Sequence, residues 1–221
     1  MLAVALGTML LLALSVAGAG AAQQKTCAKL KGKHLNARGG SATVVTQLVN
    51  RESERSGLER VAYVCASPHA RAWPAGSVSA PTESPAIAVV SGAGKWVVLR
   101  FGYVIGEASG ESESAVNAVT GKRFQFWSSS GGMGSFDGSL LEAVQLDAQG
   151  RLALILGVAG TPKNEGELAP TVTRKVVGVE ANGKRKVLDT APTASIPTSS
   201  LKLVAGVVHW TDAGVERTAA P

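Results

Sequence analysis

Histidine and cysteine, which most often ligate metals or act as catalytic bases and nucleophiles, are scarce in this chain. Only three of its 221 residues are histidine and two are cysteine. His34, His69 and His209 lie far apart and lack the close spacing to other ligands that a zinc site shows. The sequence therefore predicts neither a metal nor a cofactor.

The usual signatures of phosphate binding, hydrolysis and calcium binding are also missing. The segment GGMGSFDGS, residues 131–139, lacks both the lysine of a phosphate-binding loop and the Gly-x-Ser-x-Gly turn of a hydrolase. Glu107, Glu111 and Glu113 could collect a calcium ion, but their spacing does not match a calcium-binding loop. We predict a solvated acidic loop there.

His209 lies three positions before Asp212, a carboxylate that could assist it in catalysis. It alternates with Val207 and Thr211 on one face of a predicted strand. We therefore predict a structural or surface role for His209 and no catalytic role with Asp212.

Beyond residue 22, no stretch is apolar enough over sufficient length to cross a bilayer. Residues 2–22 carry no charge, have an apolar middle and end in small residues, which is typical of a cleaved secretory signal. An uncleaved membrane anchor is the alternative, because an uncharged run above about 18 residues can span. We predict a signal peptide at residues 1–22, one domain at residues 23–221, and a secreted or extracytoplasmic location.

The two cysteines, Cys27 and Cys65, are an even number in a chain predicted to be exported, which favours a disulfide. Closing a loop of this size contributes roughly 3 to 4 kcal/mol in the chain-entropy model. Two unpaired thiols are the alternative. Gln24, Lys25 and Thr26 are not the small apolar residues that precede a lipid-modified cysteine, so Cys27 is predicted to be a cross-link and not an anchor.

Positive charge is concentrated at the start of the predicted domain. Residues 25–71 carry a net charge of +6, residues 72–166 carry −2 and residues 167–221 carry +2. Five basic residues fall within fourteen positions: Lys25, Lys29, Lys31, Lys33 and Arg38. A solvated arm is the favoured interpretation, since interleaved aromatic residues are absent, and attraction to anionic cell-wall polymers or lipid head groups is the alternative. Nucleic acid is a poor partner for an exported chain.

A strand, turn, strand pattern with glycine in the turn recurs along the sequence. It is clearest in LDAQGRLALIL, residues 146–156, and returns in VSGAGKWVVL, NAVTGKRFQF, VEANGKRKVL and, more loosely, WTDAGVERTA. Its glycines are Gly94, Gly121, Gly150, Gly183 and Gly214, spaced by 27 to 33 residues. Glycine admits the positive φ of a tight turn, and two consecutive hairpins make a four-stranded antiparallel sheet the size of a propeller blade.

Alternating or continuously apolar residues predict about thirteen strands and little helix. The strands are placed at residues 43–49, 60–65, 86–90, 96–103, 115–119, 123–127, 140–146, 152–158, 173–179, 184–188, 201–204, 207–211 and 216–218. GRLALIL is apolar on both faces and is predicted to be a central strand covered from both sides. The Gly-, Ser- and Pro-rich segments between hairpins are predicted to be surface loops.

The predicted fold is all-β, built of antiparallel four-stranded sheets from hairpin repeats. Thirteen strands make three such sheets with one strand left over, fewer than a closed propeller of four blades needs. A small or incomplete propeller-like ring, in which amino-terminal strands complete the carboxy-terminal sheet, is one solution. A β-sandwich is the alternative, and both would bring the two ends of the chain together.

LDAQGRLALIL and VSGAGKWVVL resemble the hairpin of TolB-type β-propeller repeats, and NAVTGKR and VEANGKRKVL resemble the paired hairpin that completes a blade. The resemblance covers about residues 86–219 and extends to exported bacterial proteins with degenerate propeller-like repeats. The Pro-Asp-Gly turn of that family is replaced here by Asp-Ala-Gln-Gly and Gly-Ala-Gly. The resemblance implies a scaffold that often serves binding, and it carries over no catalytic residue.

Two functions fit these residues. The favoured one is a non-enzymatic exported β scaffold whose inter-hairpin loops bind a cell-envelope component or a protein partner. The alternative is an exported hydrolase or lyase that uses dispersed carboxylates such as Asp137, Glu142 and Asp147. The tryptophans could form a carbohydrate or peptide platform, but aromatic residues at strand positions more often fill cores. They are Trp73, Trp96, Trp127 and Trp210.

Overall fold

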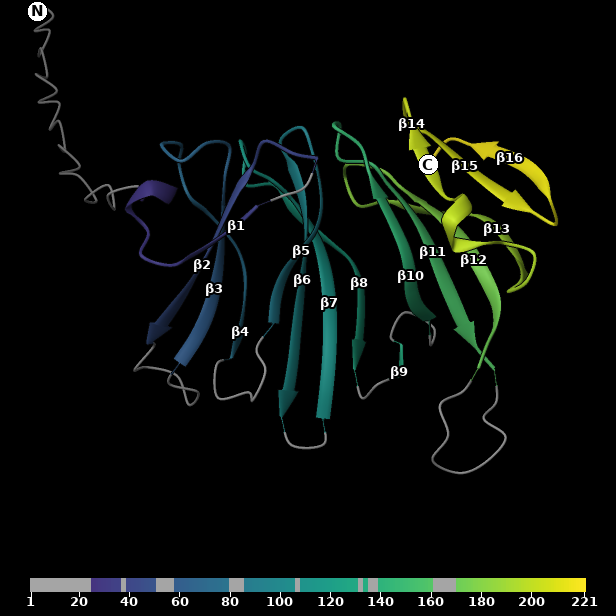
Figure 1. The fold of residues 1–221 in the computed structure, drawn as a ribbon, viewed down its shortest axis with the longest axis horizontal. Helices are drawn as coiled ribbons and strands as arrows, with labels where there is room; N and C mark the ends of the chain where they lie inside the picture. The colour runs from purple at the N-terminus through teal and green to yellow at the C-terminus, as the bar shows by residue number, and fades with distance from the viewer. Residues whose placement is uncertain are drawn as a thin grey trace, which may run out of the picture.

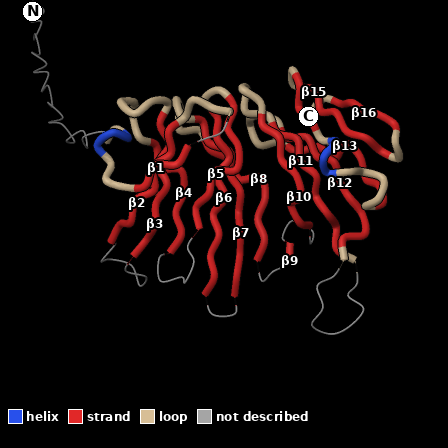
Figure 2. Tube along the Cα trace, in the orientation of Figure 1, coloured by secondary structure: helices blue, strands red, loops and turns tan. Residues whose placement is uncertain are grey.

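The fold is made almost entirely of β-strands (Figures 1 and 2). The computed structural model describes residues 25–36, 39–50, 58–79, 86–105, 108–130, 133–134, 139–160 and 170–221. These residues form sixteen strands and two short 3-10 helices, arranged as four antiparallel sheets of strands that follow one another in sequence. The predicted all-β fold of antiparallel sheets is confirmed, and the predicted signal peptide lies outside the described residues.

Each sheet is a meander of consecutive strands. The first sheet holds β1 (Lys33–Asn36), β2 (Thr43–Asn50), β3 (Leu58–Cys65) and β4 (Trp73–Ser79), preceded by the helix η1 (Cys27–Lys29). The second sheet holds β5 (Ala86–Ala93), β6 (Trp96–Ile105), β7 (Ala108–Asn117), β8 (Arg123–Ser130) and β9 (Met133–Gly134). The third sheet holds β10 (Ser139–Leu146), β11 (Leu152–Ala159), β12 (Thr171–Val179) and β13 (Arg185–Pro192). The helix η2 (Thr198–Ser200) leads to the fourth sheet, β14 (Lys202–Val204), β15 (Val207–Asp212) and β16 (Val215–Ala219).

The four sheets follow one another in chain order (Figure 1). An apolar cluster of side chains lies between each pair of successive sheets. On β6, Leu99 points into the gap with the first sheet and Val98 into the gap with the third. On β11, Leu154 faces the second sheet and Ile155 the fourth. Both strands are therefore buried on two faces, which confirms the prediction for GRLALIL and explains its unbroken apolar run.

The described sheets form an open row, which is consistent with an incomplete propeller or a sandwich, and the arrangement in which amino-terminal strands complete the last sheet is not formed. β1 pairs with β2 inside the first sheet, and the fourth sheet contains only β14, β15 and β16. The first and fourth sheets lie at opposite ends of the row (Figure 2), so the described ends of the chain are not brought together.

All thirteen predicted strands overlap observed ones, and β1, β4 and β9 are additional. β4 lies in a Pro-rich segment and most of β7 in the segment GEASGESES, both of which were predicted to be loops. Ser, Gly and Glu have little intrinsic preference for strands, so these segments owe their conformation to pairing with neighbouring strands.

Three of the glycine turns contact the sheet before their own. All five predicted turn glycines have φ between +55° and +91°, as expected. Gly121 of the second sheet lies on the ring of Trp73 in β4, and Gly150 of the third lies on the ring of Trp96 in β6, so that a Cβ at either glycine would clash with the ring. Gly183 lies near Phe124 of β8, but a Cβ there would be tight at 3.2 Å and would not overlap the ring. The turns at Gly121 and Gly150 therefore need glycine both for φ and for contact with the preceding sheet, and the turn at Gly183 needs it for φ.

Candidate functional site

The amino-terminal segment is fixed to the outer face of the first sheet. Cys27 and Cys65 form a disulfide with Cα atoms 6.2 Å apart, which confirms the predicted pair. Cys27 and Leu30 are buried against Val45 of β2. The backbone N–H of Ala28 donates to the carbonyl of Pro68 at 2.7 Å. A disulfide persists in an oxidising compartment, so the bond supports an extracytoplasmic location.

The lysines of this segment are exposed, whereas Cys27 and Leu30 between them are buried. The lysines are Lys25, Lys29, Lys31 and Lys33. Among the described residues, no carboxylate lies within ion-pair distance of any of the four ammonium groups. The expected solvation of the lysines is present, but residues 27–30 pack on the sheet and are not a free arm. Arg38 lies outside the described residues.

Arg71 extends this positive surface. It is exposed, its backbone forms a β-bridge with Thr26, and its guanidinium carbon lies 3.7 Å from the ring centroid of Trp73. The indole Nε1 of Trp73 donates in turn to the carbonyl of Val119 at 3.1 Å. We call the five exposed cations of this end the basic face: Lys25, Lys29, Lys31, Lys33 and Arg71. His34 and His69 are also exposed, as predicted for His69.

The two described carboxylates that were considered for catalysis, Glu142 and Asp147, do not form a pair. Glu142 on β10 accepts a hydrogen bond from Nε of Arg174 at 2.5 Å, and Asp147 accepts one from Nε of Arg151 at 2.6 Å. Five positions separate the two carboxylates, roughly 17 Å along an extended strand, whereas paired catalytic carboxylates lie about 5 to 10 Å apart. Asp137 lies outside the described residues.

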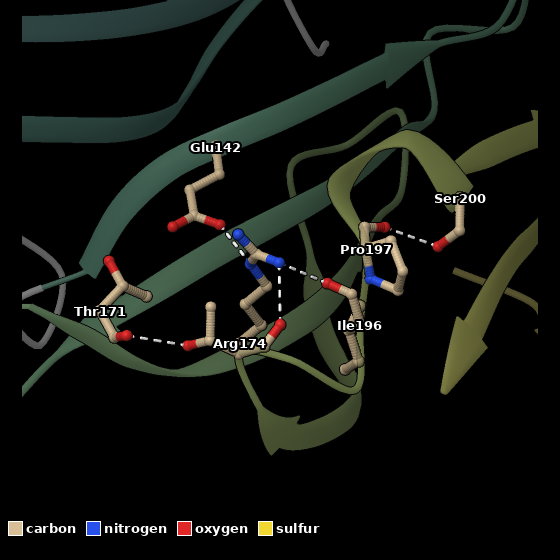
Figure 3. Close-up of polar contacts among 7 residues, drawn as sticks. Glu142, Thr171, Arg174, Ile196, Pro197 and Ser200 are labelled. Carbon is tan, nitrogen blue, oxygen red and sulfur yellow. Dashed lines mark hydrogen bonds and ion pairs between the residues drawn. The ribbon is translucent and has the colours of Figure 1, made fainter. Parts of the chain in front are cut away.

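Arg174 instead joins the third sheet to the chain that leads into the fourth (Figure 3). Its Nη1 donates to the carbonyls of Thr193 at 2.9 Å and Ile196 at 2.7 Å. Gly157 on β11 lies between Arg174 and Glu142, and a Cβ there would clash with the Glu142 carboxylate. Because Gly157 has no side chain, Arg174 and Glu142 can contact each other across β11. Glu142 has a structural role.

Two members of the acidic cluster that was predicted to be a solvated loop, Glu111 and Glu113, lie on strand β7. Glu113 is fully buried, and its Oε1 accepts hydrogen bonds from Nε of Arg100 at 2.7 Å and from Nη2 at 2.6 Å. Burial raises the pKa of Glu113, while the hydrogen bond and charge of Arg100 lower it in part. Glu111, which is half exposed, lies 4.0 Å from the same guanidinium.

The guanidinium of Arg100 thus occupies the position beside Glu111 and Glu113 that a calcium ion would need. Over the part of the chain that the structure describes, no three His, Cys, Asp or Glu side chains are grouped to hold a metal ion. Glu107 lies outside the described residues.

Three of the four tryptophans fill the gaps between sheets, as predicted. Trp96, Trp127 and Trp210 are buried, and Trp73 is partly exposed beneath Arg71.

A polar hollow of about 290 Å³ lies on the fourth sheet. Its lining residues are Ser199, Ser200, Lys202, His209, Trp210, Thr211, Gly214 and Glu216. Nδ1 of His209 lies 3.4 Å from Oε1 of Glu216 on the neighbouring strand. His209 therefore contacts Glu216 on the surface of the sheet, and the predicted surface role fits its position.

No protein-family model, curated protein or solved structure matches this chain. None of the helices in the described residues has the length and apolar character needed to cross a bilayer.

Proposed function

We propose that this protein is an exported, non-enzymatic β scaffold that binds an anionic polymer of the bacterial cell envelope through its basic face. The observation that carries the proposal is the basic face itself. Its cations are exposed, and no described carboxylate pairs with the four lysines. A dense group of uncompensated cations attracts a polyanion and concentrates it at the surface.

The rigid support of these cations favours binding. The disulfide and the burial of Cys27 and Leu30 hold the segment in one place before any partner arrives. A preorganised surface loses less conformational entropy on binding than a free arm does. The inter-hairpin loops provide further contact surface, and the resemblance to TolB-type repeats supports a binding role.

A binding role is also supported by the ion pairs that three carboxylates form with arginines. Glu142, Asp147 and Glu113 each engage an arginine that packs with them. These ion pairs satisfy structural needs of the sheets, so we assign the described carboxylates to the scaffold and not to hydrolysis.

The experiment is co-sedimentation of the disulfide-bonded protein with isolated bacterial cell walls. We expect binding at about 0.01 M salt and release at about 1 M salt, because the Debye length falls from about 30 Å to about 3 Å. Replacing the four lysines of the basic face by glutamine is expected to abolish the bound fraction at low salt. Absence of binding by the native protein at low salt refutes the proposal.

A further inference from the structure

The outer face of the fourth sheet ends the row and carries the polar hollow. On β15, Trp210 points inward to the core, whereas His209 and Thr211 point outward. The strand register places Lys202 of β14 opposite His209, and Glu216 of β16 opposite Thr211. Four polar side chains from three strands therefore converge on one concave surface.

The walls of the hollow are held in place by hydrogen bonds. The hydroxyl of Ser200 donates to the carbonyl of Pro197 at 2.7 Å and accepts from the backbone N–H of Thr211 at 3.1 Å. Figure 3 shows Ser200 and Pro197 beside the Arg174 network. The indole Nε1 of Trp210 donates to Oδ2 of Asp189 at 2.7 Å. The hollow is therefore preorganised.

The turn at the rim of the hollow is strained and uncovered. Ala213 has φ of 48° and Gly214 of 82°, and a Cβ at Gly214 would meet nothing within 4 Å. Among described residues, Ala213 and Ala205 are the non-glycine residues with positive φ, and both lie in turns of the fourth sheet. Non-glycine residues with positive φ are often found at binding sites.

The groups left available in the hollow are mainly hydrogen-bond donors. Oε1 of Glu216 lies 3.4 Å from Nδ1 of His209, and the Glu216 side chain is otherwise largely exposed. The ammonium of Lys202 and the hydroxyls of Ser199 and Thr211 have no hydrogen-bond or ion-pair partner among the described residues. A free cation calls for an anionic group on the ligand, and hydroxyls pair well with ligand hydroxyls.

We infer that this hollow binds one hydroxylated ring that carries an anionic group, a sugar acid or a sugar phosphate. Its volume of about 290 Å³ is at the lower limit of small-molecule pockets and suits a single ring. The anionic group contacts Lys202, and ring hydroxyls contact Ser199 and Thr211. This site lies on the fourth sheet, away from the basic face on the first, and does not depend on it.

The test is an NMR titration of the disulfide-bonded protein, labelled with ¹⁵N, using D-glucuronate, D-glucose 1-phosphate and D-glucose as probes. We expect amide shifts confined to the hollow with at least one anionic sugar, and much weaker binding of glucose. Lys202→Gln is expected to weaken binding about tenfold, since a hydrogen bond to a charged group is lost. Thr211→Val, which keeps the backbone N–H bond to Ser200, also weakens binding, and Lys122→Gln on an exposed turn of the second sheet is the matched control.

The two anionic probes distinguish carboxylate from phosphate recognition, and a response to either one supports the inference. It is overturned if no hollow amide shifts, if glucose binds as well as the anionic sugars, or if Lys202→Gln binds unchanged. Shifts restricted to the lysines of the basic face overturn it while leaving the proposed function intact. If the four-lysine variant no longer binds cell walls but still binds an anionic sugar in the hollow, the two sites act independently.

Discussion

At the scale of single residues, Glu113 is held by two effects of opposite sign. Burial favours its neutral form and is the larger cause, while Arg100 favours the charged form. The result is a pKa above the usual 4.5, so the folded protein holds this proton more tightly than the unfolded chain. Its stabilising contribution is full below the unfolded pKa and is lost as pH rises through the folded pKa.

Glu113→Gln removes this titration. Relative to the native protein, the free energy of unfolding of the variant is expected to rise as the pH increases above the unfolded pKa, because the native protein alone must ionise a buried acid. Urea denaturation at several pH values measures the difference. Glu111→Gln, which removes a half-exposed carboxylate from the same face of β7, is the control and should show a much smaller trend. A difference that is flat or falls with pH contradicts the account.

Gly150 and Gly214 separate the two reasons for glycine in the turns. Gly150→Ala combines an unfavourable φ of 84° with a clash against Trp96, and is expected to cost about 3 kcal/mol or more. Gly214→Ala has a similar φ of 82° but open space around the Cβ, and should cost about 1 kcal/mol. Denaturant midpoints of the two variants report the difference. Equal losses would mean that the contact with the preceding sheet contributes nothing.

The sequence predicted the backbone conformation of these turns but not their contacts. Glycine in a short turn between two predicted strands is enough to expect positive φ. Which aromatic ring lies beneath each glycine depends on how successive sheets stack, and no short-range pattern encodes that. Trp73 and Trp96 were expected in the core, and their turn partners were not foreseen.

At the scale of elements, Arg174 holds the connection between the third and fourth sheets. Arg174→Ala leaves Glu142 without its partner and frees two backbone carbonyls, and is expected to cost about 2 to 4 kcal/mol. Amide hydrogen exchange should also become faster in β14, β15 and β16 than elsewhere. Arg217→Ala, an exposed arginine on β16, is the matched control. Unchanged exchange in the fourth sheet would show that the network does not fasten it.

The disulfide holds the amino-terminal segment on the first sheet, as Arg174 holds the connection to the fourth. Replacing Cys27 and Cys65 by serine is expected to lower the free energy of unfolding by about 4 kcal/mol, given a sequence separation of 38. Residues 25–31 should then exchange their amide hydrogens faster, since they lose their covalent attachment to β3. Thermal unfolding with and without reductant measures the effect in the native protein, and a reduced form of equal stability contradicts it.

Strands were predictable wherever apolar residues recur and were missed where they do not. β6 and β11 could be assigned because both of their faces are buried, which requires long apolar runs. β7 carries the sequence ASGESESAVN, in which the buried Glu113 is paired with Arg100 on the next strand. A buried glutamate that pairs with a partly exposed arginine looks like a surface residue in the sequence, and this is why the acidic segment was predicted to be a loop.

At the scale of the whole molecule, the outer faces of the first and fourth sheets differ from the apolar faces between the sheets. The outer face of the first sheet is covered by the disulfide-linked segment, and that of the fourth presents polar side chains. A polar terminal face is what allows a stack of repeated units to end in water. The hairpin period predicted the sheets, but the choice between ring and row depends on angles between sheets and on these end faces. The candidate binding surfaces lie at the two ends.

The central claim is that the position of the cations, and not the total charge, lets this scaffold bind a cell-envelope polyanion. The most direct test compares two glutamine variants that each lose four positive charges. One replaces Lys25, Lys29, Lys31 and Lys33, and the other replaces the exposed residues Lys122, Lys184, Lys186 and Arg217. In co-sedimentation with cell walls at low salt, we predict that the first variant stays in solution while the second sediments like the native protein. Equal loss in both variants would contradict the claim.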